Sequence, residues 1–251
     1  MPDFLVDVWN HRENILKRDI FCKEGLAPVR YLVSTPPNYD QDRTRQWPLI
    51  IYLHGAGETG KNTELLKSIG IPHLLQAYDD YLNDLVPPED VNLEVAEYIA
   101  HNFITLSPQV DPTYHDRWEI KLLNAFLDET EKLYRVDKRR IYLTGVSMGG
   151  FGTFRWAMEN PKRFAAIAPV CGGADPKNVE VLKNLPIWVF HGEKDSVVDI
   201  KYSAVMVDAL KKIQGNVEFT IYPEVDHDAW TPAYNTLELY LWFDYHKNQA
   251  N

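Results

Sequence analysis

Short apolar runs alternate with helix-like stretches along most of this 251-residue chain. The runs are continuous rather than alternating in polarity, as expected of strands that are covered on both faces. Seven of them are candidate strands, at residues 29–33, 48–53, 103–106, 140–144, 165–170, 187–190 and 217–222. Helix-like stretches occupy residues 119–134, 149–159, 202–213 and 236–246. Strands that alternate with helices indicate βαβ units, so we predict an α/β fold with a mostly parallel sheet.

Composition and charge narrow the function classes. The chain is 45% hydrophobic and 12% aromatic, which excludes disorder, and we expect a single domain over residues 1–251. Its longest apolar runs are far shorter than about 18 residues, so no membrane span is expected. A formal net charge of −10 without a basic run disfavours nucleic acid and membrane surfaces as partners. The oligomeric state is left open.

Cysteine usage and the N-terminus bear on the cellular compartment. Cys22 and Cys171 form no CxxC motif and are expected to be reduced structural thiols. The first residues lack the apolar stretch and the cleavage site of a signal peptide. These observations predict a cytoplasmic protein, although a trimmed N-terminus would give the same sequence.

One segment departs from the regular alternation. Residues 61–102 separate two candidate strands by about 40 residues, where a crossover needs only about a dozen. The segment contains three prolines and the acidic aromatic stretch AYDDYLNDL. We interpret it as an insertion at one end of the sheet, either a lid over a site or an additional pair of surface helices.

The glycine-rich stretch GAGETGKN at residues 55–62 matches two nucleotide-binding patterns incompletely. It spells both GxGxxG and the start of a P-loop, but Asn62 stands where a P-loop requires Ser or Thr for Mg²⁺. The acid expected about 20 residues after a dinucleotide fingerprint would be Asp79 or Asp80, which lie in the insertion rather than at the end of a strand. Nucleotide binding is therefore disfavoured.

A second glycine-rich stretch, GVSMG at residues 145–149, matches the G-x-S-x-G pattern of a serine nucleophile. The pattern alone is common, but here it follows the strand-like RRIYLTGV and precedes the helix-like GGFGTFRWAME. Ser147 is thus predicted to lie on a sharp strand-to-helix turn that presents Oγ at the carboxyl edge of the sheet. It also needs a base, because a serine hydroxyl is a poor nucleophile at neutral pH.

The base is expected to follow the serine along the chain. His227 lies in a polar turn after the last candidate strand, where a mobile imidazole could reach Oγ. His191 closes an apolar run and is expected to be structural, while His246 lies in the last helix-like stretch. His227 is therefore the candidate base.

An acid that orients the imidazole is expected between the serine and the histidine. Asp195 follows a candidate strand on a loop at the carboxyl edge of the sheet. Glu193 is too close to the end of the strand, and Asp199 is interpreted as the cap of the next helix. Asp195 is the candidate acid, with Asp199 as its rival.

A tetrahedral intermediate also needs two backbone N–H donors. One is predicted to be the amide of Met148, the residue after the nucleophile. The other is predicted to be the amide of Ala56, or otherwise of Gly57, in the turn after an earlier strand. Both glycine-rich stretches then serve one site.

These segments together resemble the α/β-hydrolase superfamily, in particular small esterases related to polyhydroxybutyrate depolymerases and feruloyl esterases, often labelled predicted peptidases. The matching pieces are WPLIIYLHGAGE, ITLSPQ, RRIYLTGVSMGGFGTFRWA, PVCGG, PIWVFHGEKDSVV and YPEVDHDAW. The resemblance implies the α/β-hydrolase fold, a central sheet flanked by helices, with a triad of Ser147, Asp195 and His227. HGAGE and GxSMGG also look like segments of monoglyceride lipases, which implies an oxyanion hole of Ala56 and Met148. The insertion departs from the compact pattern.

The resemblance also implies residues that contact the substrate. Gln109 would be a polar handle, and Trp118 and Trp230 would form an aromatic wall beside the ester. For each tryptophan, burial in the core is the alternative.

The sequence therefore predicts a serine carboxylesterase that works through an acyl-enzyme. The resemblance implies small acyl or aromatic acyl esters, of the feruloyl or acetyl type, as its substrates. The expected partner is a small-molecule ester. No metal or organic cofactor is expected, because no His/Cys cluster has ligand spacing. A peptidase or thioesterase with the same triad is the alternative, and a hydrolase fold that only binds a ligand is another.

Overall fold

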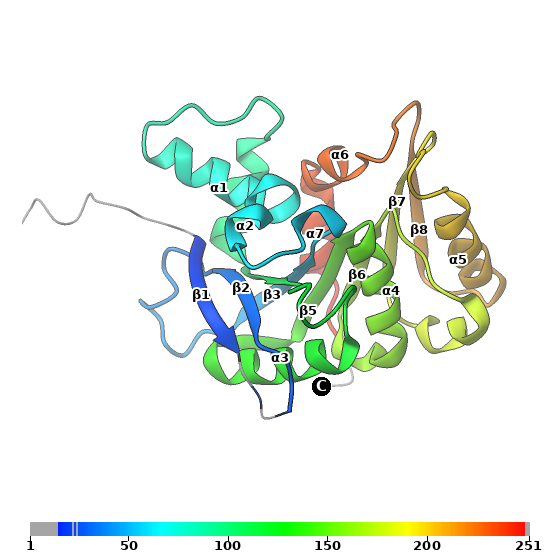
Figure 1. Ribbon diagram of the computed structural model, residues 1–251, viewed down its shortest axis with the longest axis horizontal. Coiled ribbons are helices and arrows are strands. Elements are labelled where there is room, and N and C mark those ends of the chain that lie inside the picture. Colours follow the sequence, from blue (N-terminus) through cyan, green and yellow to red (C-terminus); the bar gives the residue numbers. More distant parts are fainter. Residues whose placement is uncertain (1–14, 22, 24, 249–251) are drawn as a thin grey trace, which may run out of the picture.

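One eight-stranded sheet organises the described residues of the computed structural model, which are residues 15–21, 23 and 25–248 (Figure 1). The strands are β1 (Ile15–Phe21), β2 (Val29–Ser34), β3 (Trp47–Leu53), β4 (Ile104–Gln109), β5 (Val136–Val146), β6 (Ala166–Val170), β7 (Ile187–Gly192) and β8 (Val217–Tyr222). Their order is β1-β2-β4-β3-β5-β6-β7-β8. Strands β3 to β8 are parallel, whereas β2 is antiparallel to both of its neighbours. The predicted α/β fold with a mostly parallel sheet is confirmed.

All seven predicted strands are present, and β5 is several residues longer than predicted. The additional strand, β1, was not predicted. Its middle residues are Lys17, Arg18 and Asp19, which interrupt the apolar run. Charged residues are common on edge strands, because they discourage pairing with another chain.

The helices flank this sheet. They are α1 (Gly70–Leu82), α2 (Leu93–Asn102), α3 (Ile120–Leu133), α4 (Met148–Glu159), α5 (Lys201–Lys212), α6 (Trp230–Tyr234) and α7 (Leu237–Tyr245), with short 3-10 turns η1 (Ala56–Glu58), η2 (Thr63–Ser68), η3 (Pro161–Arg163) and η4 (Pro176–Leu182). The four predicted helices correspond to α3, α4, α5 and α7. Within the described part of the chain, no helix combines the length and the apolar composition needed to cross a membrane.

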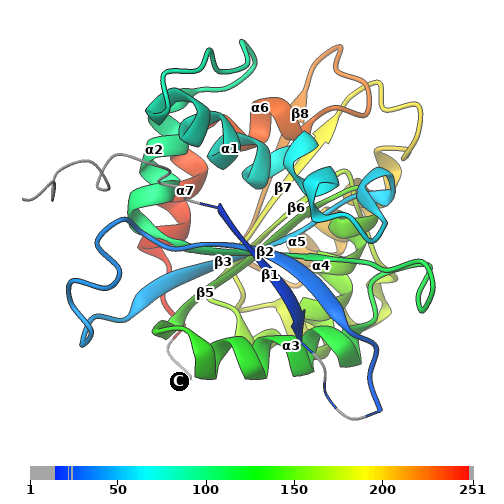
Figure 2. The same ribbon diagram turned by 60° about the vertical axis from the view of Figure 1, so that its left-hand side comes forward.

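The sheet is covered on both faces, as its continuous apolar runs predict. Along β3, Leu49 and Ile51 pack into one apolar cluster with α3, α4 and α5. Ile50 and Tyr52 point to the opposite face and pack into a second cluster with α1, α2, α6 and α7. Figure 2 shows α1 and α2 on one side of the sheet and α3 on the other. This alternation follows from the two-residue period of a strand.

The insertion at residues 61–102 forms η2, α1 and α2, so it is a helix pair. Leu74 of α1 is 2% exposed and Ile99 of α2 is fully buried in the second cluster. The connection between the two helices is exposed, with Leu85 at 58% and Val86 at 93%. The apolar faces of α1 and α2 thus pack on the sheet as part of the helical layer.

Candidate active site

Ser147 lies on the predicted turn between β5 and α4. Its backbone has φ 53° and ψ −116°, which a residue other than glycine rarely adopts. Such strain is commonly found where a side chain must be held for function. Neighbouring glycines permit the turn: a Cβ atom on Gly145 or on Gly149 would lie 2.6 or 1.9 Å from the carbonyl oxygen of Leu53. Larger residues would separate β3, β5 and α4.

Ser147, His227 and Asp195 form a continuous hydrogen-bonded chain. Nε2 of His227 lies 3.0 Å from Oγ of Ser147, and Nδ1 lies 2.7 Å from Oδ2 of Asp195. The three residues follow the carboxyl ends of β5, β8 and β7, which a parallel sheet brings to one edge. Because an ionised carboxylate only accepts, Nδ1 carries the ring proton and Nε2 is left to accept the proton of Oγ.

Asp195 is held in a site that favours its charge. Its side chain has 0% exposure. Oδ1 accepts hydrogen bonds from the amides of Val197 and Val198, at 2.9 and 2.8 Å. Burial raises the pKa of Asp195, but the hydrogen bonds from His227 and from the two amides outweigh burial and lower it below its ordinary value. The carboxylate is therefore ionised near neutral pH.

The rival acid, Asp199, has a different place. Its Oδ1 accepts from the amide of Lys201 at 2.9 Å, and its Oδ2 lies 3.1 Å from Nζ of the same residue. It is half exposed at the start of α5, where a carboxylate satisfies a free helical N–H. Asp199 thus precedes the N-cap residue Ile200 and satisfies the first amide of α5, a role close to the cap that the sequence indicated for it.

The loops that carry the acid and the base are joined to each other. Asp226, directly before His227, accepts hydrogen bonds from the amide and the hydroxyl of Ser196 at 2.7 and 2.9 Å. Ser196 directly follows Asp195. The distance between Asp195 and His227 is therefore fixed by a second link beside their own hydrogen bond.

The turn after β3 lies beside the serine. A Cβ atom on Gly55 would lie 3.6 Å from Cβ of Ser147. Ala56 is the first residue of η1 and Met148 the first residue of α4. Amides at these positions have no acceptor within their own helix, so they are available to an oxyanion. Glu58, which was not singled out from the sequence, shapes the turn by accepting from the amide of Gly55 at 3.0 Å.

Gln109 forms hydrogen bonds to this turn from the end of β4. It is 3% exposed at the end of β4, and its Nε2 donates to the carbonyls of Glu58 and Asn62, both at 2.9 Å. Its Oε1 is buried with no partner among the described residues. The amide nitrogen of the expected polar handle is thus engaged by the loop itself.

Trp118 occupies the core side of the same turn. It is 3% exposed, its Nε1 donates to the carbonyl of His54 at 3.2 Å, and its ring packs edge-on against the His54 imidazole. Burial lowers the pKa of His54 to about 4, so this ring is neutral and accepts from the amide of Val110. The position of Trp118 matches the packing alternative rather than an aromatic wall.

Trp230 borders open space beside the base. Its ring meets the His227 imidazole edge-on, with centroids 5.2 Å apart at 89°. It also lines a cavity of about 230 Å³ between α1 and α6. The polar and charged residues of this cavity include His73, Asp90, Asp228, Thr231 and Asn235. Of the three expected substrate contacts, Trp230 is therefore the one that joins the base to a cavity.

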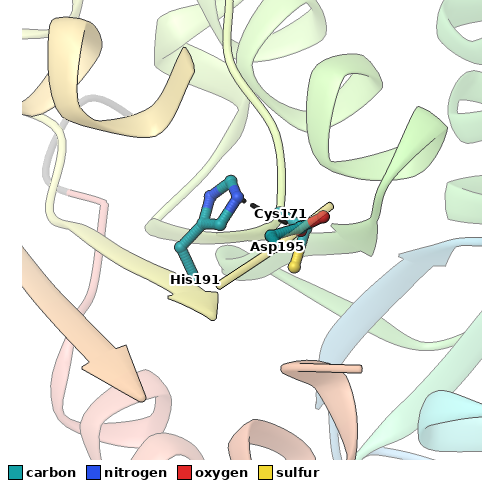
Figure 3. Close-up of side chains that lie close together, drawn as sticks. All are labelled: Cys171, His191 and Asp195. Atoms are coloured by element: carbon teal, nitrogen blue, oxygen red, sulfur yellow. Dashed lines mark ion pairs between the residues drawn. The ribbon is translucent and has the colours of Figure 1, made fainter. Parts of the chain in front are cut away.

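A cluster behind Asp195 was missed by the sequence interpretation. Possible ligand atoms of Cys171, His191 and Asp195 all lie within 4.8 Å of one another (Figure 3). Burial raises the pKa of Cys171 to about 12, so its sulfur is a thiol near neutral pH. The thiol donates to the carbonyl of His227 at 3.3 Å. The cluster is thus suited to hydrogen bonding; Cys22 lies outside the described residues.

Known proteins share this architecture. The bifunctional acetylxylan esterase/xylanase XynS20E of Neocallimastix patriciarum is 31% identical over 106 residues, 40% of this chain and 16% of that protein. A thermostable esterase of known structure is 31% identical, with a TM-score of 0.73 over 94% of this chain and 64% of its own. A ferulic acid esterase has the same fold, with a TM-score of 0.67 and 18% identity over 91% of this chain and 98% of its own. The chain spans less than two thirds of the first two proteins.

A family model described as phospholipase/carboxylesterase matches residues 116–241. This range is half of the 251-residue sequence and contains the serine, the acid and the base of the hydrogen-bonded chain. The strand order and the strained turn at Ser147 are consistent with this family match. The chain belongs to the phospholipase/carboxylesterase family of α/β-hydrolase enzymes.

Proposed function

We propose that this protein is a serine carboxylesterase that works through an acyl-enzyme, with Ser147, His227 and Asp195 as its catalytic residues. The observation that carries the proposal is the unbroken contact from Oγ of the strained serine through the imidazole to a buried, ionised carboxylate. A fold alone does not determine a reaction, whereas this arrangement has the geometry that acyl transfer requires.

The first half of the proposed reaction transfers the acyl group to the protein. His227 removes the proton of Ser147 as Oγ attacks the carbonyl carbon of the ester. The carbonyl oxygen becomes an oxyanion, which the amides of Ala56 and Met148 stabilise. The intermediate then collapses: the bond to the alcohol oxygen breaks, and the imidazolium gives its proton to the departing alcohol. An ester between Ser147 and the acyl group remains.

The second half releases the acid. His227 takes a proton from a water molecule, whose oxygen attacks the acyl carbon. The second oxyanion is held by the same two amides, and the serine oxygen departs with the proton from the imidazolium. Asp195 stays ionised throughout and orients the imidazole in both halves.

The cavity beside Trp230 supports a small substrate with polar groups. At about 230 Å³ it is smaller than the sites that hold drug-sized ligands. Asp90 and Asp228 in its lining suit hydroxyl groups better than a long acyl chain. Trp230 offers an aromatic face to an aromatic acyl group. We therefore favour acetyl-type and feruloyl-type esters, and the similarity to an acetylxylan esterase supports the first of these.

Hydrolysis of p-nitrophenyl acetate, butyrate and octanoate and of methyl ferulate tests this function. We expect the wild type to prefer acetate to octanoate, and Ser147→Ala to lower kcat by about 10⁶-fold, as removal of a triad serine does elsewhere. Undiminished turnover in Ser147→Ala would remove Ser147 from the mechanism. Cleavage of peptides or acyl thioesters without ester hydrolysis would make the protein a peptidase or thioesterase. Stabilisation by a ligand without any product would make it a binding module.

A further inference from the structure

His191 contacts Asp195 from the interior of the protein. It lies near the end of β7, and Figure 3 shows its imidazole directed at the carboxylate. Nε2 of His191 is 3.2 Å from Oδ2 of Asp195, the oxygen that also accepts from His227. Both side chains have 0% exposure, so water does not compete for this contact. Asp195 thus lies between two histidines.

The neighbours of Nε2 decide where the proton of the His191 ring lies. Besides Asp195, Nε2 contacts the carbonyl oxygen of Val198 at 2.9 Å. A carbonyl oxygen and an ionised carboxylate both accept hydrogen bonds and cannot donate them. Nε2 therefore carries a proton, which is donated to the carbonyl and faces the carboxylate. Burial lowers the pKa of His191, although Val198 and Asp195 act to raise it, so the ring is a neutral donor near neutral pH.

The opposite side of the ring is anchored to other elements. Nδ1, which accepts when Nε2 carries the proton, lies 2.7 Å from Oγ of Ser203 in α5. The carbonyl oxygen of Gly172, which follows β6, also lies 2.7 Å from this Oγ and competes for its one hydroxyl proton. Ser203 is itself fully buried. The ring thus has a polar neighbour at each nitrogen, Ser203 of α5 at Nδ1 and Val198 of the loop after β7 at Nε2. Such contacts keep a functional side chain in one rotamer.

We propose that His191 is a positioning residue that keeps Oδ2 of Asp195 aligned with Nδ1 of His227. This inference rests on the proposed function and adds a fourth side chain to the Ser–His–Asp chain. The N–H of His191 sets a partial positive charge beside Oδ2 and restricts the rotation of the carboxylate. No proton is transferred to or from His191, which acts only through Asp195.

Such a role predicts which kinetic constant changes. Without His191, the amides of Val197 and Val198 still hold Oδ1, but Oδ2 loses one of its two histidine neighbours. The imidazole of His227 is then less well aligned with Ser147, and a displacement of about 1 Å can lower kcat by about 100-fold. The contacts of His191 are with Asp195, Val198 and Ser203, so substrate binding is expected to be unaffected. The loss should therefore appear in kcat, with KM nearly unchanged.

Two amide substitutions separate the two nitrogens of the ring. The amide of Gln reaches about as far from Cα as Nε2 of His, whereas the amide of Asn reaches only as far as Nδ1. His191→Gln can therefore restore a donor beside Asp195, while His191→Asn can contact only Ser203. With p-nitrophenyl acetate, we expect His191→Asn to lose kcat by about 100-fold and His191→Gln to recover most of it.

The pair Asp195→Asn and Asp195→Asn/His191→Asn shows whether His191 acts through the acid. If it does, adding His191→Asn to Asp195→Asn changes kcat by less than about threefold, because residues that act as a unit are not additive. Thermal unfolding of each variant confirms that it is folded. Should His191→Asn not fold, Ser203→Ala and His191→Gln are compared instead, with a kcat loss expected only for Ser203→Ala, which releases the ring.

Three results would overturn the inference. The first is a wild-type kcat in folded His191→Asn or, where Ser203→Ala replaces it, in Ser203→Ala. The second is a kcat of His191→Gln as low as that of His191→Asn, and the third is a kcat loss in the double variant equal to the product of the losses in Asp195→Asn and His191→Asn. Failure of the proposed function is distinguishable. If activity survives Ser147→Ala, the proposed triad is wrong. If activity requires Ser147 but is unchanged in His191→Asn, only the proposed role of His191 is wrong.

Discussion

The two sides of the site differ in how they are built. On the side of the acid and the base, the contacts are between buried groups: Asp195 has 0% side-chain exposure and two histidines face one of its oxygens. On the side of the cavity, Trp230 is partly exposed and is joined by the exposed carboxylates of Asp90 and Asp228. The first side comes from the strands of the sheet and the second largely from the insertion and α6. Under the proposed function, the chemistry is tied to the core of the fold, while substrate selection lies in segments that can vary.

This difference predicts that substitutions on the buried side change kcat far more than KM. The largest effect after Ser147 is expected for Asp195→Asn, which leaves the imidazole in the wrong tautomer and should lower kcat by about 10⁴-fold. Asp199→Asn is the matched control on the same loop and should change kcat by less than about twofold, since an exposed helix cap contributes only about 1 kcal/mol to stability. A larger loss in Asp199→Asn would exchange the two roles.

The proposed role of Ala56 in the oxyanion hole can be tested by removing its N–H group without disturbing the backbone. Proline is tolerated at the first position of a helix, which Ala56 occupies in η1. Gly55 before it is extended, with φ −78° and ψ −173°, as a residue before proline prefers. Ala56→Pro should lower kcat by about 10²–10³-fold, as loss of one oxyanion donor does. Ala56→Ser keeps the N–H and should retain activity; equal loss in both variants would remove Ala56 from the oxyanion hole.

On the cavity side, we expect Trp230→Ala to change the ranking of substrates. Loss of the aromatic face should raise KM for methyl ferulate by about 10-fold, the lower end of what one pocket contact contributes to discrimination, and affect p-nitrophenyl acetate less. Trp118→Phe is the control, because Trp118 packs behind the turn. It should lower the thermal unfolding temperature while leaving the ratio of the two KM values unchanged. If Trp118→Phe changed the ratio of the two KM values and left the unfolding temperature unchanged, Trp118 would be a substrate contact.

The smallest expected effect is on stability at low pH. The pKa of Asp195 is lowered from its ordinary value of 3.8, so the folded state stabilises the ionised carboxylate relative to the unfolded state. Its contribution is present above about pH 3.8 and is lost as the pH falls through the folded pKa. The difference in unfolding free energy between wild type and Asp195→Asn should be constant from about pH 5 to 7 and shrink below about pH 4. Ser147→Ala, which changes no titratable group in this range, should follow the wild type.

The sequence was sufficient for residues whose position depends on the ends of strands. Ser147, Asp195 and His227 each follow an apolar run, and parallel strands bring such loops to one edge. His191 was expected to be structural because it closes an apolar run at the end of a strand. Its contacts with Ser203 and Val198 depend on how α5 and the loop after β7 pack, which no local pattern encodes. The single-domain organisation and the cytoplasmic location stay predictions.

The surroundings of the expected substrate residues and of the insertion depend on tertiary packing, which the sequence pattern does not show. Gln109 was expected to be a polar handle, and Trp118 either an aromatic wall or part of the core. Nε2 of Gln109 and Nε1 of Trp118 donate to carbonyls in the turn after β3. For the insertion, the sequence left open a lid or an additional pair of surface helices, and it gave no sign that the apolar faces of two helices would lie on the sheet. Amphipathic patterns predict that a face is covered but not what covers it.

The central claim is that Oγ of Ser147 forms a covalent acyl intermediate. It is tested most directly by treating the protein with a fluorophosphonate, which traps activated serines, and locating the adduct by peptide mass spectrometry. We expect one stoichiometric adduct on the peptide that contains Ser147, blocked activity, slower labelling in Asp195→Asn and no label in Ser147→Ala. An adduct on another residue, or full activity in protein that is labelled at Ser147, would contradict the claim.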